Sequence, residues 1–322
     1  MTVRRWFTIV TAILAVTAIL LVVGLFHAIK VVRQPGYAVS TGNPDVQLQD
    51  SAMTLHNTAC DVVIDGDSSA SVGLDPRVIT AETGLTACNI ATNRPNTDDL
   101  GTLPLDHFLA NNPKPKLIVF QFAPEDFYRA KSPWQHVGPY TPLLMLARDF
   151  PQRDALRIMA QHPAETTQFM LYILRQELMP PKVDSPKSEA QYQQVLEHAQ
   201  QSHGQLDLSI YEPAQTACRA PALTLFGPLD TTWASQLHQK YADMAIPVLV
   251  RAAPLPACDP QLEEFQRDLA PLVDDNVETL PIGMFIAGDR HATQEGSQAE
   301  TMGLVKLIES RFPNYLRQPS QP

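Results

Sequence analysis

Hydrophobic and polar positions alternate along this chain in blocks whose lengths indicate strands and helices in turn. Short apolar runs predict strands at Asp61–Asp65, Thr86–Ala91, Lys116–Phe122, Ile246–Val250 and Val277–Leu280. Helical spacing and end signals predict helices over Asp75–Gly84, Thr97–Asn111, Thr231–Met244, Pro260–Leu269 and Thr293–Phe312. Repeated strand–helix units with uninterrupted apolar strands are typical of a parallel sheet covered on both faces. We therefore expect an α/β protein, a three-layer α/β/α sandwich with a parallel sheet.

Residues 130–215 break this rhythm with a predominantly helical pattern interrupted by prolines. The apolar spacing predicts helices at Leu143–Arg148, Ala155–Ala160, Thr166–Met179 and Ser185–Gln201. This is too much chain for one crossover between strands, so it predicts a helical insertion. Two roles remain open for it: completing the core, or forming a lid or a docking face for a membrane partner.

The N-terminus carries an uncharged apolar run from Trp6 to Phe26, rich in Ile, Leu, Val and Ala. About 20 such residues suffice to cross the hydrocarbon layer as a helix, so we expect residues 1–33 to anchor the chain in a membrane. Arg4 and Arg5 favour an N-in orientation, although Lys30 and Arg33 after the run weaken the charge bias. A cleaved signal peptide would share the charged start. Its apolar region is usually only about 7–15 residues long and ends at an Ala-x-Ala-like site, which this chain lacks.

The remaining chain divides into a polar linker at 34–55, one domain at 56–315 and a tail at 316–322. The net charge of −10 and the isoelectric point near 5.3 argue against binding to nucleic acid. They also argue against docking on anionic lipid through surface charge. We expect a single-pass cell-membrane protein with its domain in the periplasm or outside the cell.

Four cysteines lie outside the apolar run: Cys60, Cys88, Cys218 and Cys258. None forms a Cys-x-x-Cys pair, and no histidine stands at metal-ligand spacing to them, so the sequence does not indicate a zinc site. Successive strands are often neighbours, which favours a Cys60–Cys88 disulfide. Cys218 and Cys258 flank one strand and form the second expected pair. Four reduced thiols are the alternative, but an exported domain favours disulfides.

Two polar segments carry the candidate chemistry, Asp61-Val-Val-Ile-Asp-Gly-Asp-Ser-Ser-Ala70 and Gly288-Asp-Arg-His-Ala-Thr-Gln-Glu-Gly296. Ser68 follows the first strand, and ligands of open parallel sheets bind beyond the carboxyl ends of strands. A serine hydroxyl becomes a nucleophile when a histidine takes its proton and a carboxylate orients that histidine. His291 and Asp289 are the candidates for these roles. The alternatives are a helix cap at Ser68 or Asp67, a solvated histidine, and a helix-start anion at Asp289.

This pair of segments resembles the blocks of the SGNH (GDSL) hydrolase family, in which Gly-Asp-Ser carries the nucleophile and a late Asp-x-x-His block carries the base. The resemblance covers roughly residues 58–312 but rests on two short motifs. Here the closing block reads Asp-x-His, a spacing similar to that of SGNH-like proteins of polysaccharide O-acetylation. The resemblance implies an SGNH-like fold with Ser68, His291 and Asp289 as catalytic residues.

The family's oxyanion donors are matched less well. A Gly-x-Asn-Asp block is expected after the third strand, but the chain reads Phe122-Ala-Pro-Glu-Asp-Phe127, with Glu125 in place of the asparagine. An ionised carboxylate donates no hydrogen bond and repels a developing oxyanion. We therefore expect the amide of Ser68 and the side chain of Asn93, after the second strand, to serve instead.

Two functions are compatible with these residues. The first is an exported serine acyl-transfer enzyme, an O-acetyltransferase or acetylesterase, acting on cell-envelope polysaccharide or exopolysaccharide beside a membrane-embedded acyltransferase. The second is a noncatalytic SGNH-like subunit that binds glycan or scaffolds a secretion complex. The expected partners are an acylated or acetyl-accepting carbohydrate and the membrane, and no cofactor or metal is expected.

Overall fold

The structure, a computed structural model, describes residues 2–34, 36–37, 57–128, 140–179, 185–206, 227–286 and 290–315. The chain clusters into two compact units. One comprises Met1–Val46 with Val137–Tyr192, and the other comprises Gln47–His136 with Gln193–Pro322. Most of the predicted linker, the tail and parts of the predicted insertion lie outside the described residues.

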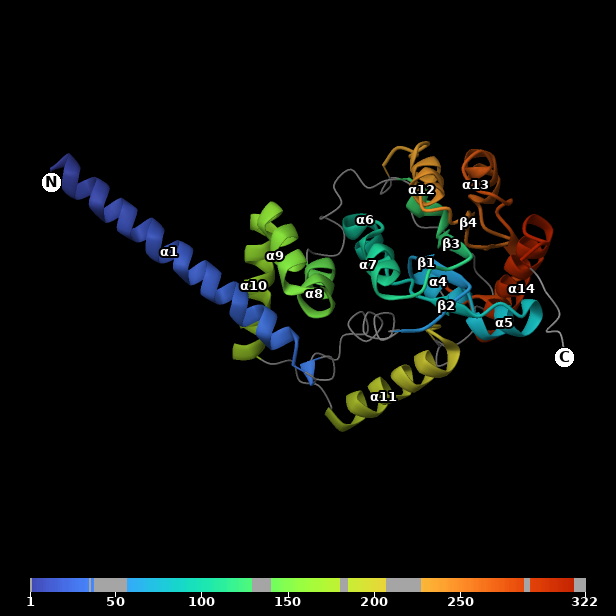
Figure 1. The fold of residues 1–322 in the computed structure, drawn as a ribbon, viewed down its shortest axis with the longest axis horizontal. Coiled ribbons are helices and arrows are strands. Elements are labelled where there is room, and N and C mark those ends of the chain that lie inside the picture. The colour runs from blue at the N-terminus through green and yellow to red at the C-terminus, as the bar shows by residue number, and fades with distance from the viewer. Residues whose placement is uncertain are drawn as a thin grey trace. The chain divides into compact units, whose positions relative to one another are not determined.

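The second unit is built on a parallel four-stranded sheet, so the protein is of the α/β class (Figure 1). The strand order is β2 (Ala87–Asn89), β1 (Val62–Gly66), β3 (Leu117–Phe122) and β4 (Val248–Ala252). Four of the five predicted strands are confirmed. The fifth, Val277–Leu280, does not join this sheet. Only Thr279–Leu280 (β6) is extended, and it pairs with Leu255–Pro256 (β5) in a separate two-stranded sheet.

Helices cover both faces of the four-stranded sheet because successive strand side chains point to opposite sides. On one side Val63, Phe120 and Val250 enter a core closed by α7 (Leu103–Asn111), α12 (Trp233–Ala242) and α13 (Leu262–Leu269). On the other side Ile64, Val119 and Leu249 meet α4 (Ser68–Gly73), α5 (Pro76–Thr83) and α14 (Gln294–Arg311).

The helix predicted over Thr97–Asn111 is wrong as a single element. It is two helices, α6 (Arg94–Leu100) and α7, separated at Gly101. Gly101 has φ 55° and ψ −126°, a conformation that side-chain-bearing residues rarely adopt, and it ends α6. The apolar spacing continues across this glycine, which explains why the sequence pattern suggests one helix.

The order of the strands creates a place for a site beside β1. Strand β2 lies next to β1 on one edge of β1, and the chain then returns to place β3 next to the other edge of β1. The connections leaving β1 and β3 therefore diverge, and such switch points form crevices at the carboxyl edge of parallel sheets. Asp67 and Ser68 follow β1 directly at this edge.

Gly66 allows β1 to end tightly against β3. Its φ is 151°, and a Cβ at this position would lie 1.9 Å from the backbone oxygen of Gln121. Any side chain would collide with the neighbouring strand, so the glycine is required by close backbone approach. The turn that carries Ser68 begins at this point.

The predicted Cys60–Cys88 disulfide is confirmed, with 5.8 Å between the two Cα atoms. It joins the start of β1 to β2 and is typical of an oxidising compartment. Cys258 is also disulfide-bonded. Cys218 lies outside the described residues, so its pairing with Cys258 stays a prediction.

The first unit contains the N-terminal helix α1 (Val3–Val32) and three helices of the insertion. These are α8 (Tyr140–Asp149), α9 (Gln152–Gln161) and α10 (Pro163–Leu178). The helix α11 (Ser185–Ser202), where the fourth insertion helix is predicted, extends from this unit into the second.

With a mean hydropathy of 2.9 in its most apolar window, α1 is long and apolar enough to cross a membrane. Its end is fixed to α8, because Arg33 Nε donates to the Ala147 oxygen at 2.7 Å and Arg148 Nη1 donates to the Val32 oxygen at 2.7 Å.

Candidate active site

The structure brings Ser68 and His291 together although they are 223 positions apart in the sequence. His291 Nε2 lies 2.8 Å from Ser68 Oγ, within hydrogen-bond distance. Ser68 is the first residue of α4, directly beyond β1, and His291 lies just before α14. Asp289 lies outside the described residues, so its contact with His291 stays a prediction.

A short backbone bridge holds His291 in place. The amide of Ile286 donates to the His291 oxygen at 2.9 Å, and the amide of Thr293 donates to the Met284 oxygen at 2.9 Å. Thr293 also caps α14, since its hydroxyl accepts from the amide of Gly296 at 3.2 Å. His291 is thus fixed from both sides by hydrogen bonds that do not involve its ring.

Asp67 shapes the turn that presents Ser68. Its Oδ1 accepts from the amide and the hydroxyl of Ser69, at 2.7 and 2.5 Å, and its Oδ2 accepts from the amide of Ala123 at 2.7 Å. Asp67 is only 1% exposed and connects the turn after β1 to the segment after β3. The helix-cap interpretation therefore applies to Asp67, while the Ser68 hydroxyl faces His291.

A pocket of about 120 Å³ surrounds this pair. Its walls come from residues 67–69 after β1, 123–126 after β3, 253–255 after β4, and from Arg94, Arg290 and His291. Among the described residues, the amide of Ser68 has no hydrogen-bond acceptor. That amide can therefore donate to an oxyanion formed beside Ser68 Oγ.

Asn93, the predicted second oxyanion donor, does not line this pocket. Its side chain caps α6, with Oδ1 accepting from the amide of Asn96 at 3.2 Å. The next residue, Arg94, lines the pocket instead. Its Nε lies 2.8 Å from Asp126 Oδ1 and 3.4 Å from Asp98 Oδ2. Arg94 was not among the residues predicted from the sequence, although its position just after the second strand was the available signal.

Glu125 is paired with Arg290, the middle residue of the Asp-x-His segment. Arg290 Nη1 donates to Glu125 Oε2 at 2.7 Å, and its Nη2 donates to Asp259 Oδ2 at 2.8 Å. The guanidinium also lies over the ring of Phe265, 5.6 Å from its centre. The negative charge of Glu125, which would repel an oxyanion, is therefore balanced by Arg290. Arg290, the residue beside His291, is in turn fixed to the segments that carry Glu125 and Asp259.

Buried carboxyl groups lie behind the Ser68 turn. Burial raises the pKa of Asp126 well above its usual range, and the neighbouring charge of Asp67 and a hydrogen bond to it act in the same direction, while Arg94 opposes them. Burial likewise raises the pKa of Asp65 to about 7. Asp126 therefore lies under two opposing influences, the negative charge of Asp67 and the positive charge of Arg94.

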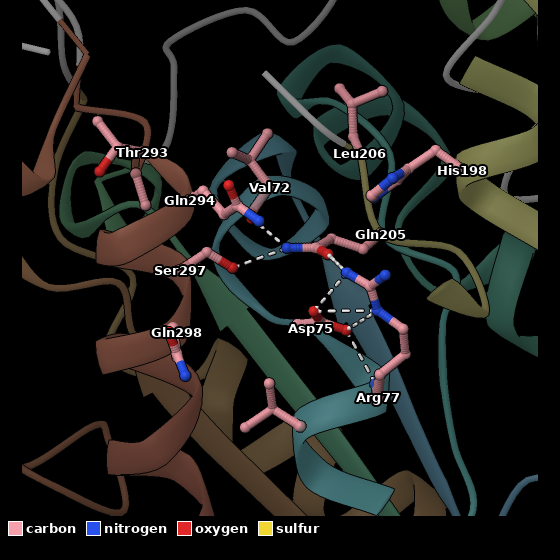
Figure 2. A pocket seen from close by; sticks show the side chains of 12 residues that line it. Val72, Asp75, Arg77, His198, Gln205, Leu206, Thr293, Gln294, Ser297 and Gln298 are labelled. Carbon is pink, nitrogen blue, oxygen red and sulfur yellow. Dashed lines mark hydrogen bonds and ion pairs between the residues drawn. The ribbon is translucent and has the colours of Figure 1, made fainter. Parts of the chain in front are cut away.

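Figure 2 shows a second, polar pocket of about 210 Å³. Ala292 and Thr293, which directly follow His291, form part of its wall. Across it, Arg77 Nη2 pairs with Asp75 at 2.7 Å, and Gln205 Nε2 donates to Ser297 Oγ at 2.7 Å. The segment 291–293 therefore contacts both pockets.

Within the described ranges, no three His, Cys, Asp or Glu side chains are grouped to hold a metal ion. No protein-family model matches the chain, and neither a curated protein nor a solved structure matches it significantly.

Proposed function

We propose that the chain is a membrane-anchored serine acyl-transfer enzyme of the SGNH type. The observation that carries this proposal is the 2.8 Å contact between Ser68 Oγ and His291 Nε2 in a pocket at the carboxyl ends of parallel strands. Nucleophile and base within hydrogen-bond distance are the signature of an activated serine. The motif resemblance and the position of Ser68 beside the switch point support the same assignment.

The reaction has two halves. Ser68 Oγ gives its proton to His291 Nε2 and attacks the carbonyl carbon of an acyl ester, and the tetrahedral intermediate expels the alcohol, which takes that proton. An acceptor hydroxyl then loses its proton to His291 and attacks the acyl-enzyme. The second tetrahedral intermediate expels Ser68 Oγ, which takes that proton back from His291 Nε2 and is restored as the hydroxyl. Asp289 orients the histidine ring in this proposal. The amide of Ser68 stabilises the oxyanion, and the guanidinium of Arg94, which lines the pocket, is the candidate for a second donor.

The substrate class follows from the setting of the site. An exported domain with a disulfide and an N-terminal apolar helix would work beside the cell envelope, and the Asp-x-His spacing is similar to that of proteins that O-acetylate polysaccharide. We propose an O-acetyltransferase or acetylesterase that acts on such a polymer, with a membrane-embedded acyltransferase as the donor partner. The domain would face the periplasm or the outside of the cell.

A noncatalytic glycan-binding or scaffold role is the alternative. It is favoured by two observations: Glu125 occupies the position of the family's amide donor, and Asn93 does not line the pocket. Loss of one oxyanion donor typically costs about 10²–10³ in rate. The alternative therefore predicts an unreactive Ser68.

Labelling by a fluorophosphonate distinguishes the catalytic role from the noncatalytic one. The wild-type chain should take up one probe per molecule at Ser68, because His291 removes the hydroxyl proton. Ser68→Ala should lose the label and His291→Ala should slow it by about 10²–10⁴. Ser235→Ala, on the exposed side of α12, is the matched control and should label normally. An unlabelled but folded wild-type chain would contradict the enzyme proposal and leave the binding role.

A further inference from the structure

The helix α10 carries an exposed apolar stripe that nothing in the proposed acyl transfer uses. Leu171, Leu174 and Leu178 are 60%, 46% and 73% exposed, and the adjoining Met179 is 69% exposed. Their spacing places the three leucines on one side of the helix. The opposite side is the packed one, since Thr166, Phe169 and Ile173 are buried.

The position of α10 along α1 indicates what surrounds this stripe. Figure 1 shows α10 lying across the C-terminal half of α1, within the same compact unit. The Sδ atom of Met170 lies 3.6 Å from the position that a Cβ on Gly24 would take. Gly24 belongs to the apolar run 6–26. The start of the stripe is therefore level with residues of α1 that would be in hydrocarbon.

The other end of α10 is level with the end of that run. Glu177 Oε2 lies 2.8 Å from His27 Nε2, and Gln176 Oε1 accepts from the hydroxyl of Tyr37 at 2.8 Å. These polar pairs begin where the apolar run stops. The helix thus straddles the boundary between the hydrocarbon and the headgroup layer, where interfacial helices bury one apolar face.

The last turns of the apolar run of α1 also expose large apolar side chains. Val23 and Phe26 are 60% and 46% exposed on the last turns of the apolar run. Arg175, exposed one turn from both Leu171 and Leu178, can extend its guanidinium toward lipid phosphates while its methylenes cover apolar surface.

We propose that α10 is embedded in the bilayer surface, with Leu171, Leu174 and Leu178 in the outer edge of the hydrocarbon of the membrane that α1 spans. The chain then holds its membrane by a spanning helix and an interfacial helix together. This inference rests on the proposed anchor role of α1 and is independent of the chemistry at Ser68.

Fluorescence of an environment-sensitive nitrobenzoxadiazole label tests the placement in the full-length chain in phosphatidylcholine vesicles. Leu174→Cys and Leu178→Cys are labelled under non-reducing conditions, with the unsubstituted chain as the blank. Both labels should be quenched about twofold by lipids carrying a doxyl group near the headgroup, and iodide should quench them little. Lys306→Cys, exposed on α14 in the other unit, is the aqueous control. Iodide should quench its label, and doxyl lipid should quench it little.

Val23→Cys in α1 reports the anchor separately. If doxyl lipid quenches the label at Val23 but iodide quenches the label at Leu174 as it does at Lys306, the stripe faces water and the inference is overturned. Protection of Leu174 from iodide without doxyl quenching would show a protein cover, from a second copy or another partner, and would also overturn it. An unquenched Val23 label would overturn the anchor and this inference, leaving the proposal for Ser68 untouched.

Discussion

At the scale of single residues, the ion pairs around His291 explain how this chain tolerates a glutamate beside its candidate nucleophile. Arg290 contacts Glu125 and Asp259 at once, and its side chain is only 12% exposed. A guanidinium holds two carboxylates in a fixed fork geometry that an ammonium cannot match. Since His291 is the next residue, the proposed reaction makes Arg290 a positioning residue for the base.

Arg290→Gln should therefore lower kcat by about 10- to 100-fold, because a shift of the base by an ångström is costly. It should also move the acid limb of the kcat/KM profile to higher pH. The two carboxylates left without their cation favour protonated His291, so the base stays protonated to higher pH. Hydrolysis of an acetylated chromogenic phenol across a pH series measures both effects.

Glu125→Gln is the matched variant for that experiment. Its amide oxygen can still accept from Arg290, and it removes a negative charge from the pocket, so turnover should be kept or raised. An Arg290→Gln enzyme with normal kcat and an unmoved acid limb would show that Arg290 has no positioning role.

The sequence predicted one kind of site residue and missed another. Ser68 and His291 lie in short contiguous motifs, and their contact needs only that both follow the correct edge of the sheet. The importance of Arg94 and Arg290 depends on Asp126, Glu125 and Asp259, which come from separate segments. Pairings between distant segments leave no local pattern, so they appear only in the folded chain.

At the scale of elements, the buried parallel strands were the most predictable part of the fold. β3 is apolar at nearly every position and is buried throughout, and its predicted bounds differ from the observed ones by one residue. Local backbone geometry was harder to foresee. The positive φ at Gly101 divides one predicted helix in two. β6 pairs with β5 across the intervening helix α13, a contact between separate segments that leaves no local pattern.

The end of β1 gives a prediction at this scale. Gly66→Ala should lower the free energy of unfolding by about 3 kcal/mol, because its Cβ would collide with the Gln121 carbonyl of β3 and its φ is positive. Gly84→Ala, at the end of α5, is the control. Its φ is also positive, 75°, but no atom lies within 4 Å of the added Cβ. It should cost only about 1 kcal/mol.

Thermal unfolding of both variants, followed by circular dichroism, compares the two costs. Labelling of Ser68 should fall in Gly66→Ala more than in Gly84→Ala, since only Gly66 sets the turn beside Ser68. Equal unfolding temperatures in the two variants would mean that the approach of β1 to β3 adds no constraint.

At the scale of the whole second unit, a buried carboxyl group connects three elements. Glu300 of α14 is 3% exposed, and its Oε1 accepts from Gln121 Nε2 of β3 at 2.7 Å. It also faces Gly73 of α4, where a Cβ would lie 2.4 Å from its Oε2. Burial raises the pKa of Glu300 from 4.5 to about 8 and outweighs the opposing effects of the Arg251 charge and the Gln121 hydrogen bond. Arg251 also pairs with Asp275 and Glu278.

This raised pKa makes stability depend on pH. The folded chain keeps a proton on Glu300 that the unfolded chain releases above its ordinary pKa of 4.5. The contribution of Glu300 to the free energy of unfolding is therefore complete below about pH 4.5 and is lost as the pH rises toward 8, by at most about 1.4 kcal/mol per pH unit. Glu300→Gln imitates the protonated form and keeps the acceptor for Gln121. It should match the wild-type unfolding temperature at pH 5 and exceed it at pH 8.

Unfolding temperatures at pH 5 and pH 8, in buffers of equal ionic strength, test whether Glu300 is protonated in the folded chain. Glu309→Gln is the matched control, because Glu309 lies exposed on the same helix and should leave the pH dependence unchanged. Asp65, whose pKa is also raised, acts in the same direction in every variant, so the difference between Glu300→Gln and the wild type isolates one group. Parallel curves for these two proteins would show that Glu300 is ionised in the folded chain. Arg251 would then have to balance a third carboxylate, and the contact of α14 with β3 would be ionic.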